Sequence, residues 1–123
     1  MADILIIDDD ELLIELFSDI LTDAGHTIRS ATDGASGLAE AARSLPEMIV
    51  LDMYMPVLDG YAVVKALRAD PATRMLPIVA VTGLNTPADH DAIRQAGCSA
   101  FIAKPIQPDH LVAVVRSLLA PVA

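Results

Sequence analysis

The stretch Ile4-Leu5-Ile6-Ile7-Asp8-Asp9-Asp10 joins a continuous apolar run to three acidic residues. A short run of large, mostly β-branched residues is typical of a strand that is buried on both faces of a parallel sheet. The next segment, 11–24, places apolar residues at helical spacing, and Gly25 stands where a helix C-cap is expected. We expect this helix to face the core through Leu13, Leu16, Phe17, Ile20 and Leu21. The two patterns indicate a buried strand followed by an amphipathic helix.

The alternation of apolar run and helical pattern continues along the chain. Further strands are predicted over 27–31, 48–51, 77–81 and 100–102, and further helices over 34–44, 61–69, 87–96 and 109–119. Strands that alternate with helices form a parallel sheet covered by helices on both faces, so the sequence predicts an α/β fold. The sequence shows neither a linker nor an internal repeat. We expect one domain over residues 1–123, with its core over 3–119.

Composition bears on the compartment in which the protein works. Hydrophobic residues make up 54% of the 123 residues and charged residues 20%, which is enough apolar material for a core without disulfide bonds. Cys98 is the only cysteine, which suits a reducing cytoplasm. Residues 1–4 lack the basic and apolar regions of a signal peptide, and no apolar run approaches the about 18 residues of a membrane span. We therefore expect a cytoplasmic protein that does not insert into membranes.

The charge distribution argues against direct binding of nucleic acid. The net charge is −9, and the eight Lys and Arg residues are spread along the chain without clustering. Phosphate contacts need a basic face, which this pattern does not supply. A negative net charge suits a protein that binds a divalent cation, although many soluble proteins are acidic for solubility.

Polar side chains follow the predicted strands at the points where these strands end. In a parallel sheet of this kind, ligands bind beyond the carboxyl ends of the strands, near the switch point in strand order. We therefore expect the groups at the strand ends to gather at one edge of the sheet. These groups are Asp8, Asp9 and Asp10 after the first strand, Asp52 after the third, Thr82 after the fourth and Lys104 after the fifth. Asp10 can instead be interpreted as the cap of the first helix.

This set of groups suits a divalent cation and a phosphoryl group. Two carboxylates about 4 Å apart repel by about 4 kcal/mol at an effective dielectric constant of about 20. Lys104 supplies one positive charge, which leaves room for a hard cation such as Mg²⁺ with oxygen ligands. Such a site can hold phosphoryl oxygens through the cation, Lys104 and the Thr82 hydroxyl. Asp52 is the candidate nucleophile, because it ends a central strand and carboxylates can form aspartyl phosphates.

Five short motifs occur in order along the chain. They are Ile4-Leu5-Ile6-Ile7-Asp8-Asp9-Asp10, Ile49-Val50-Leu51-Asp52-Met53, Met55-Pro56 with Asp59-Gly60, Ala80-Val81-Thr82-Gly83, and Lys104-Pro105. Each motif alone is weak, whereas all five in this order are highly specific. From Ile4 to Leu119 the chain resembles the receiver domain of two-component response regulators, the CheY-like domains. The stretch from Gly97 to Ile106 is also similar to that of small single-domain regulators such as DivK.

The resemblance implies a doubly wound, flavodoxin-like sheet of five strands in the order 2-1-3-4-5. It implies that Asp52 is a phosphoacceptor, which takes a phosphoryl group from a histidine kinase or a histidine phosphotransfer protein in a reaction that needs Mg²⁺ or Mn²⁺. The implied metal ligands are Asp8, Asp9, Asp52 and the backbone carbonyl of Tyr54, with Asp8 usually acting through water. Such a domain assists its own phosphorylation and dephosphorylation and is not otherwise an enzyme.

The resemblance also implies a switch that follows phosphorylation. Thr82 matches the hydroxyl that moves toward the phosphoryl group, Lys104 matches the lysine that pairs with it, and Phe101 matches an aromatic that turns inward. The bond between Lys104 and Pro105 is expected to be cis, and X–Pro is the bond type for which the cis form is accessible. The change of shape would carry the signal to a downstream protein.

Signal input and output are expected on separate surfaces. The phosphodonor should dock on the first helix, where Ile14 lies off the core stripe and is a candidate exposed apolar contact. The responding face should include Leu84, Asn85, Phe101 and the exposed side of 87–96. If the chain is complete, its output passes to a protein partner by contact. If the chain is part of a longer protein, the output lies in the remainder.

Two positions depart from the commonest receiver pattern. Phe101 has no hydroxyl, so a switch through this residue rests on packing alone. Tyr54 is bulkier than the small or polar residue often found two places after the phosphoacceptor. Together with Leu84 it would shield the phosphoryl group from water and slow self-dephosphorylation, although a tolerated surface tyrosine explains it equally well. Gly83 leaves the approach to Asp52 open, which fits phosphotransfer.

Three other functions are open at this point. A phosphohydrolase of the haloacid dehalogenase type uses similar groups, but it needs an acid two residues after the nucleophile, where Tyr54 stands. A receiver-like interaction module without phosphorylation would be indicated by the loss of Asp9, Asp52 or Lys104, and all three are present. A flavin-binding protein of the same fold would need a phosphate-binding loop after the first strand, where three acidic residues stand.

Overall fold

The computed structural model describes residues 2–84 and 86–119. Its strands are β1 (Asp3–Ile7), β2 (Thr27–Ala31), β3 (Met48–Asp52), β4 (Ile78–Thr82) and β5 (Ala100–Ala103). Its helices are α1 (Glu11–Asp23), α2 (Gly34–Arg43), α3 (Gly60–Ala69), α4 (Pro87–Ala96) and α5 (Pro108–Leu119). All ten elements lie within about one residue of the predicted bounds. Asn85, expected on the responding face, and residues 1 and 120–123 of the expected domain lie outside the described residues.

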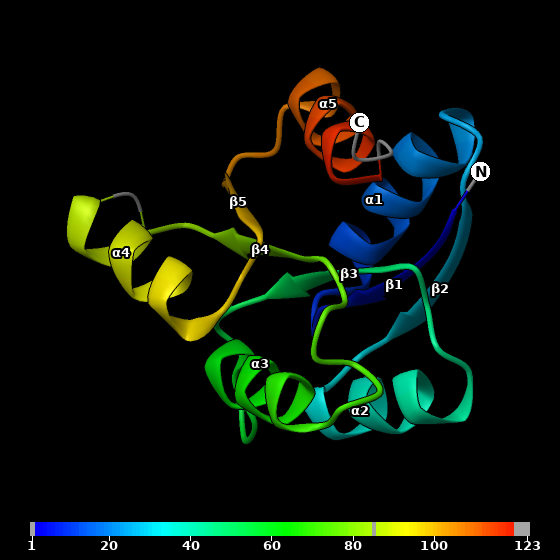
Figure 1. The fold of residues 1–123 in the computed structure, drawn as a ribbon. Helices are drawn as coiled ribbons and strands as arrows, with labels where there is room; N and C mark the ends of the chain where they lie inside the picture. The colour runs from blue at the N-terminus through cyan, green and yellow to red at the C-terminus, as the bar shows by residue number, and fades with distance from the viewer. Residues whose placement is uncertain (1, 85, 120–123) are drawn as a thin grey trace.

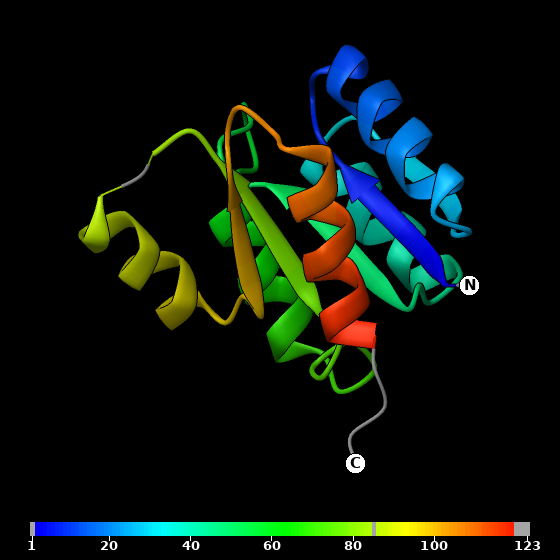
Figure 2. The same ribbon diagram turned by 90° about the horizontal axis from the view of Figure 1, so that it is seen from above.

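The five strands form one parallel sheet in the order β2-β1-β3-β4-β5, as predicted. From β1 the chain moves to the edge of the sheet at β2 and returns to the other side of β1 at β3 (Figure 1). The helices α1 and α5 cover one face, α2 and α3 cover the other, and α4 lies beside β5 (Figures 1 and 2). The carboxyl ends of β1 and β3 therefore flank the switch point, where sheets of this kind bind ligands.

Alternate residues of the central strands fill two separate hydrophobic layers. The layer toward α2 and α3 includes Leu5, Ile7, Ile49, Leu51 and Leu67. The layer toward α1 and α5 includes Ile4, Ile6, Phe17, Val50 and Leu111. Every residue of β3 and β4 is buried. Because successive side chains of a strand point to opposite faces, continuous apolar runs are what two covered faces require.

Side-chain caps determine where the helices begin. Asp10 accepts hydrogen bonds from the backbone N–H groups of Leu12 and Leu13, so its role as the cap of α1 is confirmed. Asp33 and Asp59 cap α2 and α3 in the same way. The side chain of Asp10 is thereby engaged by the helix, while its backbone N–H donates to Asp8 Oδ1. None of the helices in the described part of the chain is long and apolar enough to cross a membrane.

The outward face of α1 differs from the prediction. Leu16, predicted to face the core, is 41% exposed, and Leu12 one turn earlier is 77% exposed. Ile14, predicted as an exposed contact, is half-buried and packs against the layer between the sheet, α1 and α5. Ile14 precedes the fully buried Phe17 by three residues, a spacing that places both on one helical face. The exposed apolar stripe of α1 is therefore Leu12 and Leu16.

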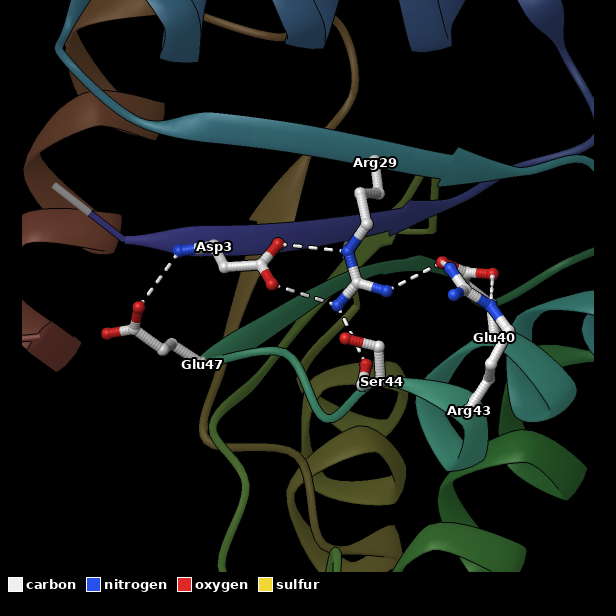
Figure 3. Close-up of polar contacts among 6 residues, drawn as sticks. All are labelled: Asp3, Arg29, Glu40, Arg43, Ser44 and Glu47. Atoms are coloured by element: carbon white, nitrogen blue, oxygen red, sulfur yellow. Dashed lines mark hydrogen bonds and ion pairs between the residues drawn. The ribbon is translucent and has the colours of Figure 1, made fainter.

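A network of ion pairs ties the edge strand β2 to β1 and α2 (Figure 3). Arg29 on β2 donates two hydrogen bonds of 3.0 Å to the carboxylate of Asp3 and one of 2.6 Å to Glu40. It also donates to the backbone carbonyl of Ser44 at 2.8 Å, just after α2. Arg43 donates two further hydrogen bonds to Glu40, and the two guanidinium groups together lower the pKa of Glu40 to about 2.

Candidate functional site

Three carboxylates meet where β1 and β3 end. Asp8, Asp9 and Asp52 each offer a carboxylate oxygen, and these oxygens lie within 4.8 Å of one another. Asp8 and Asp52 are buried, with 1% and 4% of their surface exposed, whereas Asp9 is exposed. Ile7 pairs with Leu51 in the register of β1 and β3, so the next residues, Asp8 and Asp52, lie side by side at the strand ends. The structure brings together the acids that the sequence predicts at this edge.

Burial and crowding make negative charge costly in this cluster. The backbone N–H of Asp10 donates to Asp8 Oδ1 at 2.9 Å, whereas Asp8 Oδ2 is buried and has no hydrogen-bond partner among the described residues. Burial raises the pKa of Asp8 to about 6, and the charge of Asp52 adds to this effect. Burial also raises the pKa of Asp52, although the N–H of Tyr54, 3.1 Å from Oδ1, and the charge of Lys104 oppose the shift. A further positive charge would therefore stabilise the cluster.

The cluster fits a divalent cation that takes oxygen ligands. Hard cations such as Mg²⁺ bind through one or two carboxylates together with water. The buried oxygen of Asp8 without a hydrogen-bond partner is a ligand position that the described residues do not otherwise use. Asp8, Asp9 and Asp52 are the residues that would hold such a cation. That the backbone carbonyl of Tyr54 is also a ligand of the cation stays a prediction.

The ends of β4 and β5 bring a lysine and a hydroxyl to the same edge. Lys104 follows β5, and its Nζ lies 3.9 Å from Asp52 Oδ1. The Lys104–Pro105 peptide bond is cis, and the backbone N–H of Lys104 donates to the carbonyl of Thr82 at 2.8 Å. Thr82 is fully buried, and its hydroxyl oxygen accepts a 3.0 Å hydrogen bond from the N–H of Leu84. The hydroxyl is therefore engaged by the loop that leads to α4.

Comparison with known proteins adds an independent line of evidence. The sequence profile of the response regulator receiver domain matches residues 4–116. The chain belongs to this family. The receiver domain is 42% identical over 117 residues to the response regulator PleD of Caulobacter vibrioides, a match that covers 95% of this chain and 26% of PleD. It is 33% identical over 116 residues to the polar-differentiation response regulator DivK of Brucella anthropi, and this match covers 94% of both chains.

Solved structures share the fold of the receiver domain. The chemotaxis protein CheY4 of Vibrio cholerae superposes with a TM-score of 0.91 at 30% identity, covering 97% of this chain and 99% of CheY4. The signal receiver domain of a histidine kinase from Syntrophus aciditrophicus gives a TM-score of 0.89 at 29% identity, covering 97% and 90%. The chain is therefore a receiver domain of two-component signal transduction, and it spans about a quarter of PleD. Family membership sets aside the phosphohydrolase and the flavin-binding protein. The interaction module without phosphorylation is still to be tested.

Four further residues named from the sequence lie within or shortly after strands β3, β4 and β5. Tyr54 and Leu84 are 47% and 45% exposed, and their proposed shielding of a phosphoryl group stays a prediction. Gly83 is exposed, and a Cβ atom added there would meet no atom within 4 Å; that it leaves the approach to Asp52 open stays a prediction. Phe101 on β5 is half-buried and packs against the hydrophobic layer that faces α2 and α3.

Two residues have roles that sequence reasoning did not identify. A Cβ atom added to Gly60 would lie 2.5 Å from Met53 Cα and 2.8 Å from the carbonyl oxygen of Asp52, so only glycine lets α3 start this close to the end of β3. The Asp-Gly pair of the third motif was the available signal. His90 of α4 stacks on Phe101, with ring centroids 4.0 Å apart and planes inclined by 24°. No sequence pattern indicates this contact, because the rotation of α4 about its axis relative to β5 depends on tertiary packing.

Proposed function

We propose that the receiver domain accepts a phosphoryl group on Asp52 from a histidine kinase or a histidine phosphotransfer protein, with Mg²⁺ or Mn²⁺ held by the acidic cluster. One observation carries this proposal. The buried carboxylate of Asp52 shares the edge of the sheet with the carboxylates of Asp8 and Asp9 and with Lys104 Nζ at 3.9 Å. A nucleophile, a cation site and a phosphate-pairing ammonium group are the parts that phosphoryl transfer needs.

In the proposed reaction, a carboxylate oxygen of Asp52 attacks the phosphorus atom of a phosphohistidine. A P–O bond forms, the P–N bond breaks, and its electron pair stays on the imidazole nitrogen of the donor. The N–H of Tyr54 orients the carboxylate through its hydrogen bond to Asp52 Oδ1. Lys104 would pair with one phosphoryl oxygen, and the Thr82 hydroxyl would donate to another after it releases Leu84. When bound, the divalent cation supplies neutralisation of the phosphoryl oxygens.

The domain would act as a phosphoacceptor and not as an enzyme that acts on a separate substrate, because Asp52 is itself modified. It would assist its own phosphorylation and its own dephosphorylation. Phosphorylation adds a charge of about −1.5 to −2. Movement of Thr82 toward that charge would free the N–H of Leu84 and change the loop before α4, with Phe101 following by packing. The altered face would then be recognised by a downstream protein partner.

The surface of α1 supports docking of the phosphodonor beside the site. Leu12 and Leu16 are exposed on the helix that starts directly after the acidic residues of β1, so a partner that covers them would also reach Asp52. The acidic net charge of −9 argues against nucleic acid as a partner. The single cysteine, Cys98, is buried as a free thiol, which suits the proposed cytoplasmic location.

A labelling experiment tests this function. The protein is incubated with phosphoramidate and Mg²⁺, and intact-mass spectrometry should detect one labile phosphoryl adduct. Asp52→Asn should remove the adduct, whereas Asp19→Asn, an exposed carboxylate on α1, should keep it. Chelation of the metal should also prevent labelling. A wild-type chain that stays unmodified would identify the protein as an interaction module without phosphorylation, and equal labelling of the Asp52→Asn variant would remove Asp52 from the proposed role.

A further inference from the structure

Helix α4 has fewer buried residues than any other helix in the described part of the chain. Ile93 is its single buried residue, whereas each of the other four helices buries two or more. Its carboxyl end is fixed by Arg68 of α3, whose Nε donates to the carbonyl of Gly97 at 2.9 Å and whose Nη1 donates to the carbonyl of Leu76 at 2.7 Å. Its amino end carries a local capping box at Thr86. Figure 2 shows α4 projecting beside β5, away from α1 and α5.

The first half of α4 is held through the ring of His90. This ring stacks nearly parallel on Phe101 of β5 at a centroid distance of 4.0 Å, so the two ring faces are in close contact. His90 Nε2 is buried and has no hydrogen-bond partner among the described residues. The imidazole therefore contributes to this contact by packing, and its Nε2 atom makes no hydrogen bond among the described residues. An unpartnered buried nitrogen weakens the contact, because opening the stack would let water solvate it.

The stack lies next to the hydroxyl that the proposed function moves. Phe101 pairs with Ala80 in the register of β4 and β5, two residues before Thr82. Among the described residues, two contacts link the segment between β4 and the middle of α4 to the site and to β5: the hydrogen bond from Leu84 N–H to Thr82 Oγ1 and the stack of His90 on Phe101. Phosphorylation as proposed above would break the first contact directly, and the movement of Phe101 that follows would then have to break the second.

We infer that His90 is a positioning residue for the switch: its ring holds Phe101 and the first half of α4 in the unphosphorylated arrangement and so sets how readily the domain is activated. This inference rests on the proposed function, because it concerns the equilibrium that the phosphoryl group shifts. A contact made in only one of two states lowers the apparent affinity for whatever selects the other state. Weakening the stack should raise the affinity for a phosphoryl mimic, and strengthening it should lower that affinity.

Three substitutions give an ordered expectation. His90→Ala removes the ring, and His90→Gln removes the ring but keeps a polar side chain. Both should lower the half-saturating concentration of beryllofluoride, a phosphoryl mimic used with Mg²⁺, by about 2- to 12-fold, the range that corresponds to the roughly 0.5–1.5 kcal/mol of an aromatic pair. His90→Phe keeps a ring without the unpartnered nitrogen and should raise that concentration. Gln95→Ala, an exposed position on the same helix, should leave it unchanged.

Fluorine NMR of protein labelled with 4-fluorophenylalanine reports both the stack and the titration. The chain has two phenylalanines, and Phe17 is fully buried in the layer beneath α1, so its signal serves as an internal reference for folding. Before beryllofluoride is added, the Phe101 signal should move in the His90→Ala and His90→Gln variants, while the Phe17 signal stays in place. Addition of beryllofluoride then gives the half-saturating concentration for each variant.

The outcomes separate this inference from the function on which it rests. Equal half-saturation in wild type, His90→Ala and Gln95→Ala would overturn the role of His90 while leaving Asp52 as the acceptor. A shift in the same direction for His90→Ala and His90→Phe would overturn it too, since the two changes act oppositely on the stack. A wild-type protein that is labelled by phosphoramidate yet gives no change at Phe101 with beryllofluoride would also contradict it. Failure of wild type in both labelling and titration would instead overturn the proposed function.

Discussion

At the scale of single residues, we expect the acidic cluster to lower the folding stability of the metal-free protein. Asp8 is buried beside Asp52, its Oδ2 has no partner among the described residues, and its pKa is raised to about 6. A raised pKa of a carboxyl group means that its ionised form is less favourable in the folded chain than in the unfolded chain. The proposed role of Asp8 in holding a cation and the stability of the metal-free protein therefore make opposite demands on this side chain.

Asp8→Asn should stabilise the metal-free protein. The amide removes one negative charge from the cluster, and its oxygen can still accept the hydrogen bond from Asp10 N–H. We expect the free energy of unfolding at neutral pH to rise by about 1 kcal/mol, less than the whole pKa shift would give, because Asp9 in the same cluster is exposed and water screens the charges there. Urea unfolding in the presence of a chelator measures this change. A variant less stable than wild type under these conditions would show that the carboxylate is not under strain.

Gly60 sets the approach of α3 to the strand that carries Asp52. The added Cβ of a Gly60→Ala variant would meet backbone atoms, Met53 Cα at 2.5 Å and the Asp52 carbonyl oxygen at 2.8 Å, and these cannot move aside as a flexible side chain can. We expect a loss of about 1–3 kcal/mol in the free energy of unfolding. Gly83→Ala is the matched control, because a Cβ added there meets nothing within 4 Å. Similar denaturation midpoints for the two variants would contradict this account.

At the scale of elements, the edge strand β2 depends on the ion-pair network of Figure 3. Arg29 uses its guanidinium group on Asp3, Glu40 and Ser44, and it thereby joins β2, β1 and the end of α2. The sequence places Arg29 within a strand but shows no partner for it. The partners come from the next helix and from the neighbouring strand, so only the assembled sheet reveals them.

The contribution of Glu40 should depend on pH in one direction. Hydrogen bonds from Arg43 and Arg29 lower its pKa from 4.5 to about 2. A depressed folded-state pKa gives stability that is fully present above 4.5 and is lost as the pH falls toward 2. Wild type should therefore be more stable than Glu40→Gln near neutral pH. The difference in free energy of unfolding between the two proteins should shrink as the pH falls from 4.5 toward 2. Urea unfolding at a series of pH values measures it, with Glu15→Gln on the exposed face of α1 as control. A constant difference would contradict the role of the ionised carboxylate.

The exposed stripe of α1 should affect phosphotransfer from a protein donor and not labelling by a small molecule. The double change Leu12→Ala and Leu16→Ala leaves the core and the acidic cluster in place, because both side chains point to solvent. We expect transfer from a phosphorylated histidine phosphotransfer protein to slow by about 10-fold or more, as for apolar residues at the centre of an interface. Labelling by phosphoramidate should be unchanged. Leu45→Ala, exposed after α2, is the control, and an equal loss in it would remove α1 as the docking surface.

At the scale of the whole molecule, strand–helix alternation was sufficient to predict the parallel sheet and the edge at which Asp8, Asp9, Asp52 and Lys104 meet. The end of a strand can be located from the local sequence. A parallel sheet brings the carboxyl ends of its strands to one edge, independently of how the side chains pack. The outward stripe of α1 was assigned wrongly, because Leu16 lies next to the core stripe and a step of one residue decides its exposure. The stack of His90 on Phe101 was not predictable, since it depends on the placement of α4 against β5.

Metal binding should stabilise the domain as a whole, because the proposed ligands of the cation come from two different strands. Asp8 follows β1 and Asp52 ends β3, so the site exists only when the sheet is assembled. A ligand that binds the folded chain alone adds about 2.7 kcal/mol of stability at a free concentration of about 100 times its dissociation constant. We expect the unfolding midpoint to rise steadily with Mg²⁺ in wild type and to stay nearly constant in Asp9→Asn. Asp19→Asn, an exposed carboxylate in the middle of α1, should respond as wild type does. An Asp9→Asn variant stabilised as strongly as wild type would mean that the cation binds elsewhere on this acidic chain.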